Sequence, residues 1–218
     1  MKNISTVISV FLLLWLVGCR SYQAQYVNTS GVQLFSDGKY AEALARFQAA
    51  VEANPDDADS YYNIAAVHHY LGRVNRDANQ YAQAGQNYQF CLAKSPNHTA
   101  AYRGYTVWLM EQNRQEDAVE LLENWADQNP TLPDPKIELS RLYQELGQSR
   151  EAIDYAAAAI ALDSKDARAH RALGYLRELS SDWNQAILNY KYSLEADPNQ
   201  PDLIDRITFL ENQTGLSR

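Results

Sequence analysis

The sequence predicts an all-α protein built from repeated helical hairpins, and two observations carry this prediction. One stretch shows the apolar spacing of two helices that pack together, and alanine recurs in register at five places along the 218 residues. A single hairpin cannot cover its own apolar face, so such units are stable only when several are stacked. Repetition and helical spacing together therefore define the fold class.

The clearest hairpin lies in residues 167–198, where two amphipathic segments are separated by residues 180–182. Small Gly174 in the first segment suits a place where two helices cross closely. Pro198 ends the second segment, because proline has no amide hydrogen for a further helical turn. The second segment repeats its apolar residues at the i, i+3, i+4 and i+7 spacing of one helix face, with the two large ones filling the space beside the crossing: Trp183, Ala186, Ile187 and Tyr190.

Copies of this hairpin are found by counting back from the residue that closes each one. The closing residues are Pro55, Pro96, Pro130, Ser164 and Pro198. Twelve residues before them stand Ala43, Ala84, Ala118, Ala152 and Ala186. Eight residues before them the side chain is mostly large and apolar: Phe47, Tyr88, Leu122, Ala156 and Tyr190. The last three closing residues are 34 residues apart, which gives the period of the repeat.

These positions resemble the tetratricopeptide repeat (TPR), whose signature has leucine and glycine in the first helix, then alanine, an aromatic residue and a closing proline in the second. The last unit supplies Leu173, Gly174, Ala186, Tyr190 and Pro198. The resemblance implies a right-handed α-α superhelix, a TPR solenoid of five helix-turn-helix repeats followed by a C-terminal capping helix. The expected units are residues 25–57, 58–98, 99–132, 133–166 and 167–200, with the capping helix and tail in residues 201–218.

The capping helix is expected to bury one side and to present polar residues on the other, as the end of a repeat stack requires. The side expected to be apolar carries Leu203, Ile204, Ile207 and Leu210. The side expected to be polar carries Asp202, Asp205, Arg206 and Glu211.

The second unit is seven residues longer than the period, and the extra length falls after Gly72, within residues Arg73 to Gln80. Seven residues are about two helical turns, so the second helix could lengthen without rotating its buried face. A polar surface loop is the simpler interpretation, because surface insertions cost little. The alternative is a contact device with Arg73 and Arg76 at its tip.

The N-terminus resembles a bacterial lipoprotein signal peptide in residues 1–18. Lys2 precedes an apolar run that ends at Gly18, directly before Cys19. In such lipoproteins the peptidase cuts before a cysteine that already carries a diacylglycerol, so the resemblance implies lipidation of Cys19 and a short tether in residues 19–24. An uncleaved signal anchor is the alternative. Arg20, where enterobacterial lipoproteins kept at the inner membrane tend to have aspartate, favours the outer membrane as the location in the cell envelope.

The resemblance also implies where partners bind, because the first helices of TPR units line a concave groove. Tyrosines and arginines at these positions could stack on a partner segment and pair with its carboxylates. Packing of the rings, and ion pairs within the chain, are the alternatives for each of them. Carried over by register, the groove candidates are Asn28, Phe35, Tyr62, His69, Tyr70, Arg103, Arg141, Arg171 and Tyr175.

Other classes of function have little support. The net charge of −8 argues against nucleic acid, which needs a basic face. No phosphate loop, nucleophile motif or metal-ligand spacing is present, so neither an enzyme nor a cofactor or metal site is expected. Cys91 stands where the repeat has a small residue and is expected to be a buried, unreactive thiol; a redox role lacks a suitably placed histidine.

The sequence thus predicts a lipid-anchored TPR scaffold or adaptor of the bacterial cell envelope that binds proteins through its groove. Pilotin lipoproteins of type IV pili and lipoproteins that gather peptidoglycan hydrolases have similar architecture, and the resemblance does not choose between them. A module that binds glycan or peptidoglycan directly is the alternative, since Tyr62, Tyr70 and Tyr175 could stack on sugars.

Overall fold

The computed structural model describes residues 23–215, and every regular element in that range is an α-helix, as predicted. The expected signal peptide in residues 1–18 and the lipidation site Cys19 lie outside the described residues. Between residues 23 and 215, none of the helices combines the length and the apolar character that crossing a bilayer would need.

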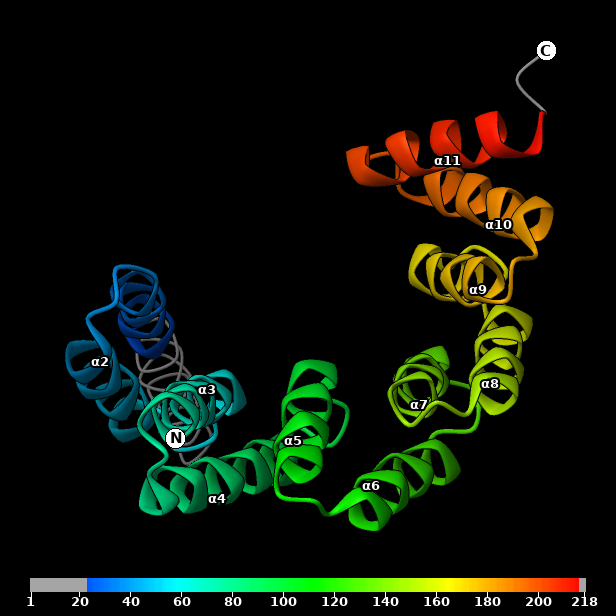
Figure 1. Cartoon of the computed structure of the whole chain (residues 1–218). Helices are drawn as coiled ribbons and strands as arrows, with labels where there is room; N and C mark the ends of the chain where they lie inside the picture. Colours follow the sequence, from blue (N-terminus) through cyan, green and yellow to red (C-terminus); the bar gives the residue numbers. More distant parts are fainter. Residues whose placement is uncertain (1–22, 216–218) are drawn as a thin grey trace, which may run out of the picture. The chain divides into compact units, whose positions relative to one another are not determined.

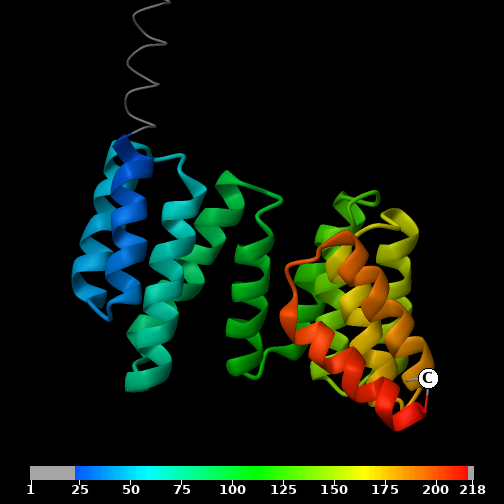
Figure 2. The same cartoon turned by 90° about the horizontal axis from the view of Figure 1, so that it is seen from above.

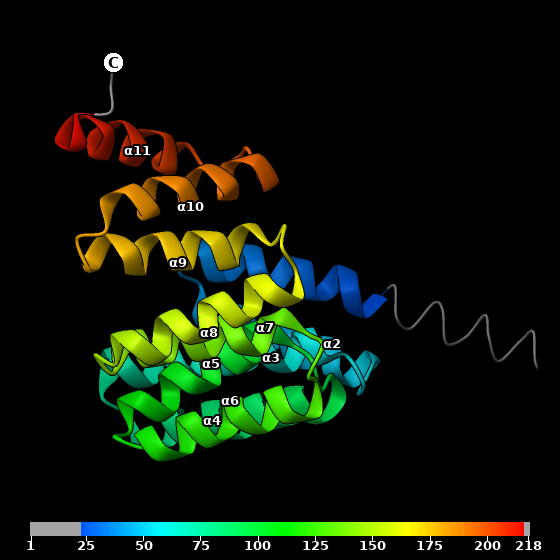
Figure 3. The ribbon, with the colours of Figure 1, turned by 90° about the vertical axis from the view of Figure 1, so that its right-hand side faces the viewer.

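The chain divides into two compact units, and the division falls between Asn113 and Arg114 (Figure 1). The first unit has a helix over residues 23–36, then α2 (Tyr40–Ala53), α3 (Ala58–Asn75), α4 (Ala78–Lys94) and α5 (Thr99–Glu111). The second has α6 (Gln115–Gln128), α7 (Pro133–Glu145), α8 (Ser149–Leu162), α9 (Ala167–Leu179), α10 (Trp183–Ala196) and α11 (Pro201–Thr214). Within the second unit α8, α9, α10 and α11 pack in succession, one layer on the next (Figure 3).

The repeated alanines form the centre of the helix packing. All five are fully buried, because a methyl group is what fits where two helices cross closely. The residues four positions later are buried as well, with at most 2% of their surface exposed. The two series are Ala43, Ala84, Ala118, Ala152 and Ala186, and Phe47, Tyr88, Leu122, Ala156 and Tyr190.

The glycine of the last hairpin also lies where the sequence predicts a close crossing. A Cβ atom on Gly174 would lie 2.6 Å from the Cδ1 atom of Tyr190, so only glycine fits between the two helices. Gly31 has the same relation to Phe47, at 2.5 Å. Trp183 was expected to fill space beside Gly174, but it stands at the first turn of α10 and is 37% exposed.

Each hairpin turn contains one residue in the left-handed backbone conformation, two positions before the second helix begins. Glycine adopts this conformation freely, whereas a side chain with Cβ is strained there. Two of the five are glycines, and the others carry side chains: Gly38, Arg76, Asn113, Gly147 and Ser181, with φ between 53° and 77°.

The extra residues of the second unit lengthen both of its helices and leave only Arg76 and Asp77 in the turn between them, so the interpretation as a polar loop is wrong. Helix α3 has 18 residues where α5, α7 and α9 have 13, and α4 has 17 where α6, α8 and α10 have 14. Helical backbone satisfies its own hydrogen bonds, which a loop of the same length would leave to water. The turn of this lengthened hairpin α3–α4 projects farther than the turn before α2 (Figure 2).

The capping helix α11 differs from expectation on its outer side. Leu203, Ile207 and Leu210 are buried against α10, as predicted. Ile204 was expected on the same side but is 53% exposed, and Phe209 is 50% exposed. The apolar face is narrower than the sequence suggested, because a helix turns 100° per residue and Ile204 is carried past the edge of α10.

Candidate functional site

Two of the groove candidates in the first unit are part of an aromatic cluster. The rings of Phe35, Tyr40 and Tyr70 meet with centroid distances of 4.8 to 6.1 Å, and all three are half-buried. Edge-to-face aromatic pairs of this kind stabilise packing. Tyr70 and Phe35 are therefore committed mainly to the packing of the first helix on α2 and α3.

Tyr62 is also held by neighbouring rings. Its centroid lies 5.2 Å from that of His98 and 6.4 Å from that of Tyr88. Burial raises the pKa of Tyr62, against the opposing effect of the positive charge of Arg103. Arg103 itself is exposed. Another candidate of the first unit, Asn28, accepts a hydrogen bond of 2.8 Å from the side chain of Asn63.

His69 is buried at the centre of a polar network. Its Nδ1 atom lies 3.1 Å from the hydroxyl of Tyr88, and its Nε2 atom lies 3.0 Å from Oε2 of Glu111. The same Glu111 oxygen accepts a hydrogen bond of 3.1 Å from Tyr81. With both ring nitrogens occupied, His69 ties α3 to α4 and α5 and is not available to a partner.

In the second unit, Arg141 pairs along its own helix. It contacts the buried Glu138 at 3.0 Å and Glu145 at 3.4 Å. A buried carboxylate needs such a partner, because an unpaired charge would be costly there. Arg141 thus has the intrachain role that the sequence left open as an alternative.

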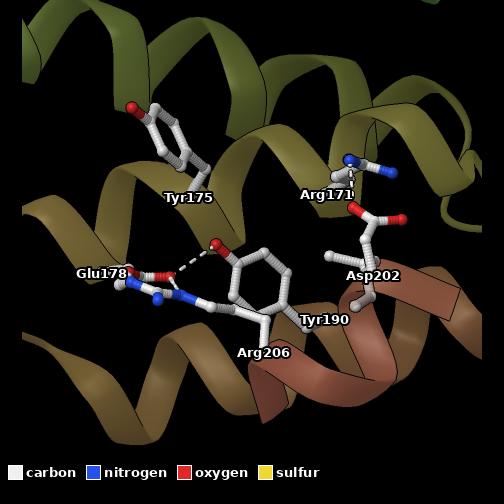
Figure 4. Close-up of a pocket in the computed structure, with 7 residues that line it drawn as sticks. Arg171, Tyr175, Glu178, Tyr190, Asp202 and Arg206 are labelled. Carbon is white, nitrogen blue, oxygen red and sulfur yellow. Dashed lines mark hydrogen bonds and ion pairs between the residues drawn. The ribbon is translucent and has the colours of Figure 1, made fainter. Parts of the chain in front are cut away.

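The other two candidates of this unit line an open pocket of about 360 Å³ between α9, α10 and α11. Figure 4 shows the ring of Tyr175 beside the pocket, with Tyr190 between Glu178 and Asp202. Tyr175 is 45% exposed, and no ring pair or hydrogen bond holds it within the described chain. We call this the C-terminal pocket; its lining residues are Arg171, Tyr175, Glu178, Tyr190, Asp202, Leu203 and Arg206.

Ion pairs across the C-terminal pocket join α9 to the capping helix. Nη2 of Arg171 lies 2.6 Å from Oδ2 of Asp202, and Nε of Arg206 donates to Glu178 Oε2 at 2.9 Å. The hydroxyl of Tyr190 donates to the same Glu178 oxygen at 2.9 Å. Burial raises the pKa of Tyr190 to about 12, so this hydroxyl stays protonated and donates at neutral pH.

Sequence reasoning missed two residues of this pocket. Asp202 and Arg206 were expected on the outer, polar side of the capping helix, but both face α9. Their spacing of one helical turn placed them together on a face, and the opposite charges at Arg171 and Glu178 were the signal that this face meets α9. Glu211 is likewise not simply solvated, because it pairs with Lys191 at 2.7 Å.

No metal or nucleophilic centre emerges from the part of the chain that the structure describes. Residues 23–215 contain no group of three or more histidine, cysteine or acidic side chains that could hold a metal ion. Cys91 is a free thiol with no exposed surface, and burial raises its pKa to about 12. It is the buried small residue that the repeat predicts.

Comparison with known proteins identifies the family of these hairpins. Residues 31–72 match a family model described as TPR repeat, and residues 75–131 and 109–174 match one described as tetratricopeptide repeat. A thermophilic TPR protein of Thermus thermophilus is 26% identical, with a TM-score of 0.63 over 86% of this chain and 98% of that one. A structure of pilF from Pseudomonas aeruginosa has a TM-score of 0.57 and 15% identity over 91% of this chain and 95% of that one, which supports the fold alone.

A curated relative shares only part of its length with this chain. The human RANBP2-like and GRIP domain-containing protein 1 is 37% identical over 71 residues, which are 33% of this chain and 4% of that protein. On the repeat matches and the stacked hairpins together, this chain belongs to the tetratricopeptide repeat family.

Proposed function

We propose that this protein is a membrane-anchored bacterial lipoprotein whose repeats serve as a protein-interaction scaffold in a complex of the cell envelope. The TPR fold supports the scaffold role. The single observation that carries the binding site is the C-terminal pocket, where the exposed ring of Tyr175 stands beside Arg171 and Arg206.

The pocket offers a partner segment both stacking and charge. Arg171 and Asp202 have side chains that are 47% and 60% exposed, and an exposed ion pair contributes at most about 1 kcal/mol. A carboxylate of a partner can therefore replace Asp202 on Arg171 at little cost. An apolar side chain of the same segment would lie on Tyr175.

Site-specific crosslinking tests this site. A photo-reactive benzoylphenylalanine replaces Tyr175 in the native host, and a second strain carries it at Tyr192, which is equally exposed at 45% but does not line the pocket. Crosslinks to a defined protein from position 175, lost in the Arg171→Gln background and absent from position 192, are the expected result. Equal crosslinking from both positions would reject the pocket as the binding site.

The lipid anchor rests on the sequence around Cys19 and is tested separately. Labelled palmitate should enter the wild-type protein and not the Cys19→Ala variant, and that variant should keep its signal peptide and run as a larger protein, because cleavage requires the lipidated cysteine. A wild-type protein that is membrane-bound, unlabelled and of the same size as the variant would argue for an uncleaved signal anchor. Fractionation of inner and outer membranes would test the predicted location in the outer membrane.

Direct glycan binding is the second candidate, and only Tyr175 favours it. Tyr62 and Tyr70 are engaged with neighbouring rings, which leaves fewer exposed aromatic faces for sugars than the sequence suggested. Binding to purified peptidoglycan that is lost in Tyr175→Ala would support this candidate over a protein partner.

A further inference from the structure

The lengthened hairpin α3–α4 creates a second open pocket, of about 450 Å³, in the first unit. It lies where the added turns of α3 and α4 meet the end of α5. None of its lining residues is acidic, and two are arginines: Arg73, Arg76, Ala78, Tyr81, Ala82, Trp108 and Gln112. We call it the hairpin pocket.

The aromatic wall of this pocket is held in place from behind. The indole Nε1 of Trp108 donates to the backbone oxygen of Tyr81 at 2.9 Å, and the Tyr81 hydroxyl donates to Glu111 at 3.1 Å. Two glycines let the rings approach: a Cβ on Gly85 would lie 2.8 Å from the Trp108 ring, and one on Gly72 would lie 3.0 Å from the Tyr81 amide. A wall fixed in this way loses little conformational entropy when a ligand binds.

The two arginines are only weakly engaged. The side chain of Arg73 is 60% exposed, and its nearest carboxylate oxygen, on Glu111, is 3.8 Å away. Arg76 is exposed and forms no ion pair with any residue between 23 and 215. Glu111 contacts His69 and accepts from Tyr81 through Oε2, and its other oxygen faces Arg73 at the 3.8 Å separation of a loose ion pair.

The backbone at Arg76 adds an independent observation. Its φ is 53°, a left-handed conformation that is strained for an arginine and relaxed for a glycine. The same turn position is glycine in two other hairpins, and asparagine and serine, which are small and uncharged, in the remaining two. A cation kept at a strained position points to a use for its side chain.

We infer that the hairpin pocket binds an extended segment of a partner protein that carries an aspartate or glutamate side chain next to an apolar one. The carboxylate lies between Arg73 and Arg76, and the apolar side chain lies on Trp108 and Tyr81. Guanidinium groups bind carboxylates through paired hydrogen bonds, and the rigid aromatic wall supplies the apolar contact. This site is separate from the C-terminal pocket and does not depend on it.

A peptide fits this pocket better than a polyanion does. The chain has a net charge of −8, and Asp77 lies next to Arg76, where it caps α4 with bonds of 2.8 and 3.3 Å. A phosphate-rich surface would be repelled by these charges, whereas one carboxylate needs only the two arginines. Four of the seven lining residues are alanines or aromatic residues, and a bare anion would leave their apolar surface unused.

Titration of the purified full-length protein in mild detergent tests the inference. The probes are N-acetylated, C-amidated hexapeptides with Glu or Asp beside Phe or Leu, each with a Gln or Asn counterpart, and the readout is the NMR signal of the Trp108 indole N–H. Acidic peptides should shift that signal and bind at least about tenfold more tightly than their amide counterparts. Acidic and amide peptides that bind equally, or no shift with any peptide, would overturn the inference.

Two matched variants test whether the positive charge of Arg76 in the pocket is what binds the acidic peptides. Arg76→Asn removes the cation but keeps a residue that tolerates the left-handed turn, so it should weaken acidic-peptide binding about tenfold without unfolding the hairpin. Arg46→Gln removes an exposed arginine of α2 outside the pocket and should leave binding unchanged. Equal losses in the two variants would mean a general charge effect. The same shift produced by inorganic phosphate, or by an amide peptide with a free C-terminus, would assign the pocket to a different anion and reject the acidic side chain.

Discussion

Gly174 on α9 lies directly against the ring of Tyr190 on α10, and the hydroxyl of that ring donates to Glu178 at 2.9 Å. Because residue 174 has no Cβ atom, the ring of Tyr190 can lie against α9, and there it forms part of the lining of the C-terminal pocket. Gly174, a residue of the repeat signature, thus packs directly against Tyr190, a residue that lines the candidate site.

Replacement of Gly174 by alanine tests this relationship. A Cβ atom would lie 2.6 Å from the Tyr190 ring, and overpacking of this kind costs about 1–3 kcal/mol. Alanine has a better helix propensity than glycine by roughly 1 kcal/mol, so the net loss of unfolding free energy should be up to about 2 kcal/mol, measured by urea unfolding. In a double-mutant cycle with Tyr190→Leu, the penalty of the alanine should shrink; additive penalties would contradict the steric cause.

Asp166 should make the second unit sensitive to acid. It caps α9 by accepting from the amides of Arg168 and Ala169 at 2.8 and 3.1 Å. Burial alone would raise the pKa of Asp166, but the hydrogen bonds from Arg168 and Ala169 outweigh it and hold the pKa below its ordinary value. The folded state therefore binds this proton less readily than the unfolded chain does. The stabilisation is complete above about pH 4 and is lost as the pH falls through the lowered pKa.

The comparison that isolates this effect is Asp166→Asn, which keeps a capping oxygen but cannot titrate. Urea unfolding of both proteins should give a larger difference at neutral pH than at about pH 2–3. A difference that stays constant across this range would show that the Asp166 charge contributes nothing.

Cys91 should be inert until the first unit opens. Burial raises the pKa of its thiol to about 12, and the thiolate is the species that alkylating reagents attack. Iodoacetamide at about pH 8 should therefore modify the Cys91 peptide on the order of 100-fold more slowly in the native protein than in guanidinium chloride. Fast native labelling, followed by mass spectrometry, would indicate that α4 opens locally.

Alanine variants of Tyr62 and Tyr175 should differ in stability, because the first tyrosine is a packing residue and the second is a candidate binding residue. Tyr62→Ala removes a ring held against His98 and Tyr88 and should lower the free energy of unfolding by about 2 kcal/mol or more. Tyr175→Ala removes an exposed ring and should change it by less than about 0.5 kcal/mol. Comparable losses in the two variants would mean that Tyr175 is also a packing residue, and its crosslinks would need another interpretation.

The hairpins could be predicted from the sequence because the repeat imposes the same demand five times. Burial of Ala43 through Ala186 follows from spacing alone, as does the close approach at Gly174. The groove could not be predicted at the level of side chains. Tyr70 could stack on a partner or on Tyr40, and contacts between hairpins decide which. The helical period of the sequence carries no information about those contacts.

The sequence also could not decide the secondary structure of the extra residues, or which face of the capping helix packs against the preceding helices. The stretch from Arg73 to Gln80 is compatible with a loop or with added turns of helix, and the packing of α3 on α4, and of both on α5, selects the helices. From the sequence, Arg206 is expected to be a solvated charge, but in the structure it forms an ion pair with Glu178. Each of these outcomes depends on a long-range partner.

The added length of the second unit is contained in the two arms of a single hairpin and in the turn that joins them. Such an extension is modular, since it adds surface next to the turn of the hairpin while the opposite ends of the two helices keep the spacing of the other units. Evolution can then lengthen one unit of an array to acquire a new contact without redesigning the rest. The same property would let an engineer move the stretch from Arg73 to Gln80 into another unit, or excise it, as a self-contained graft.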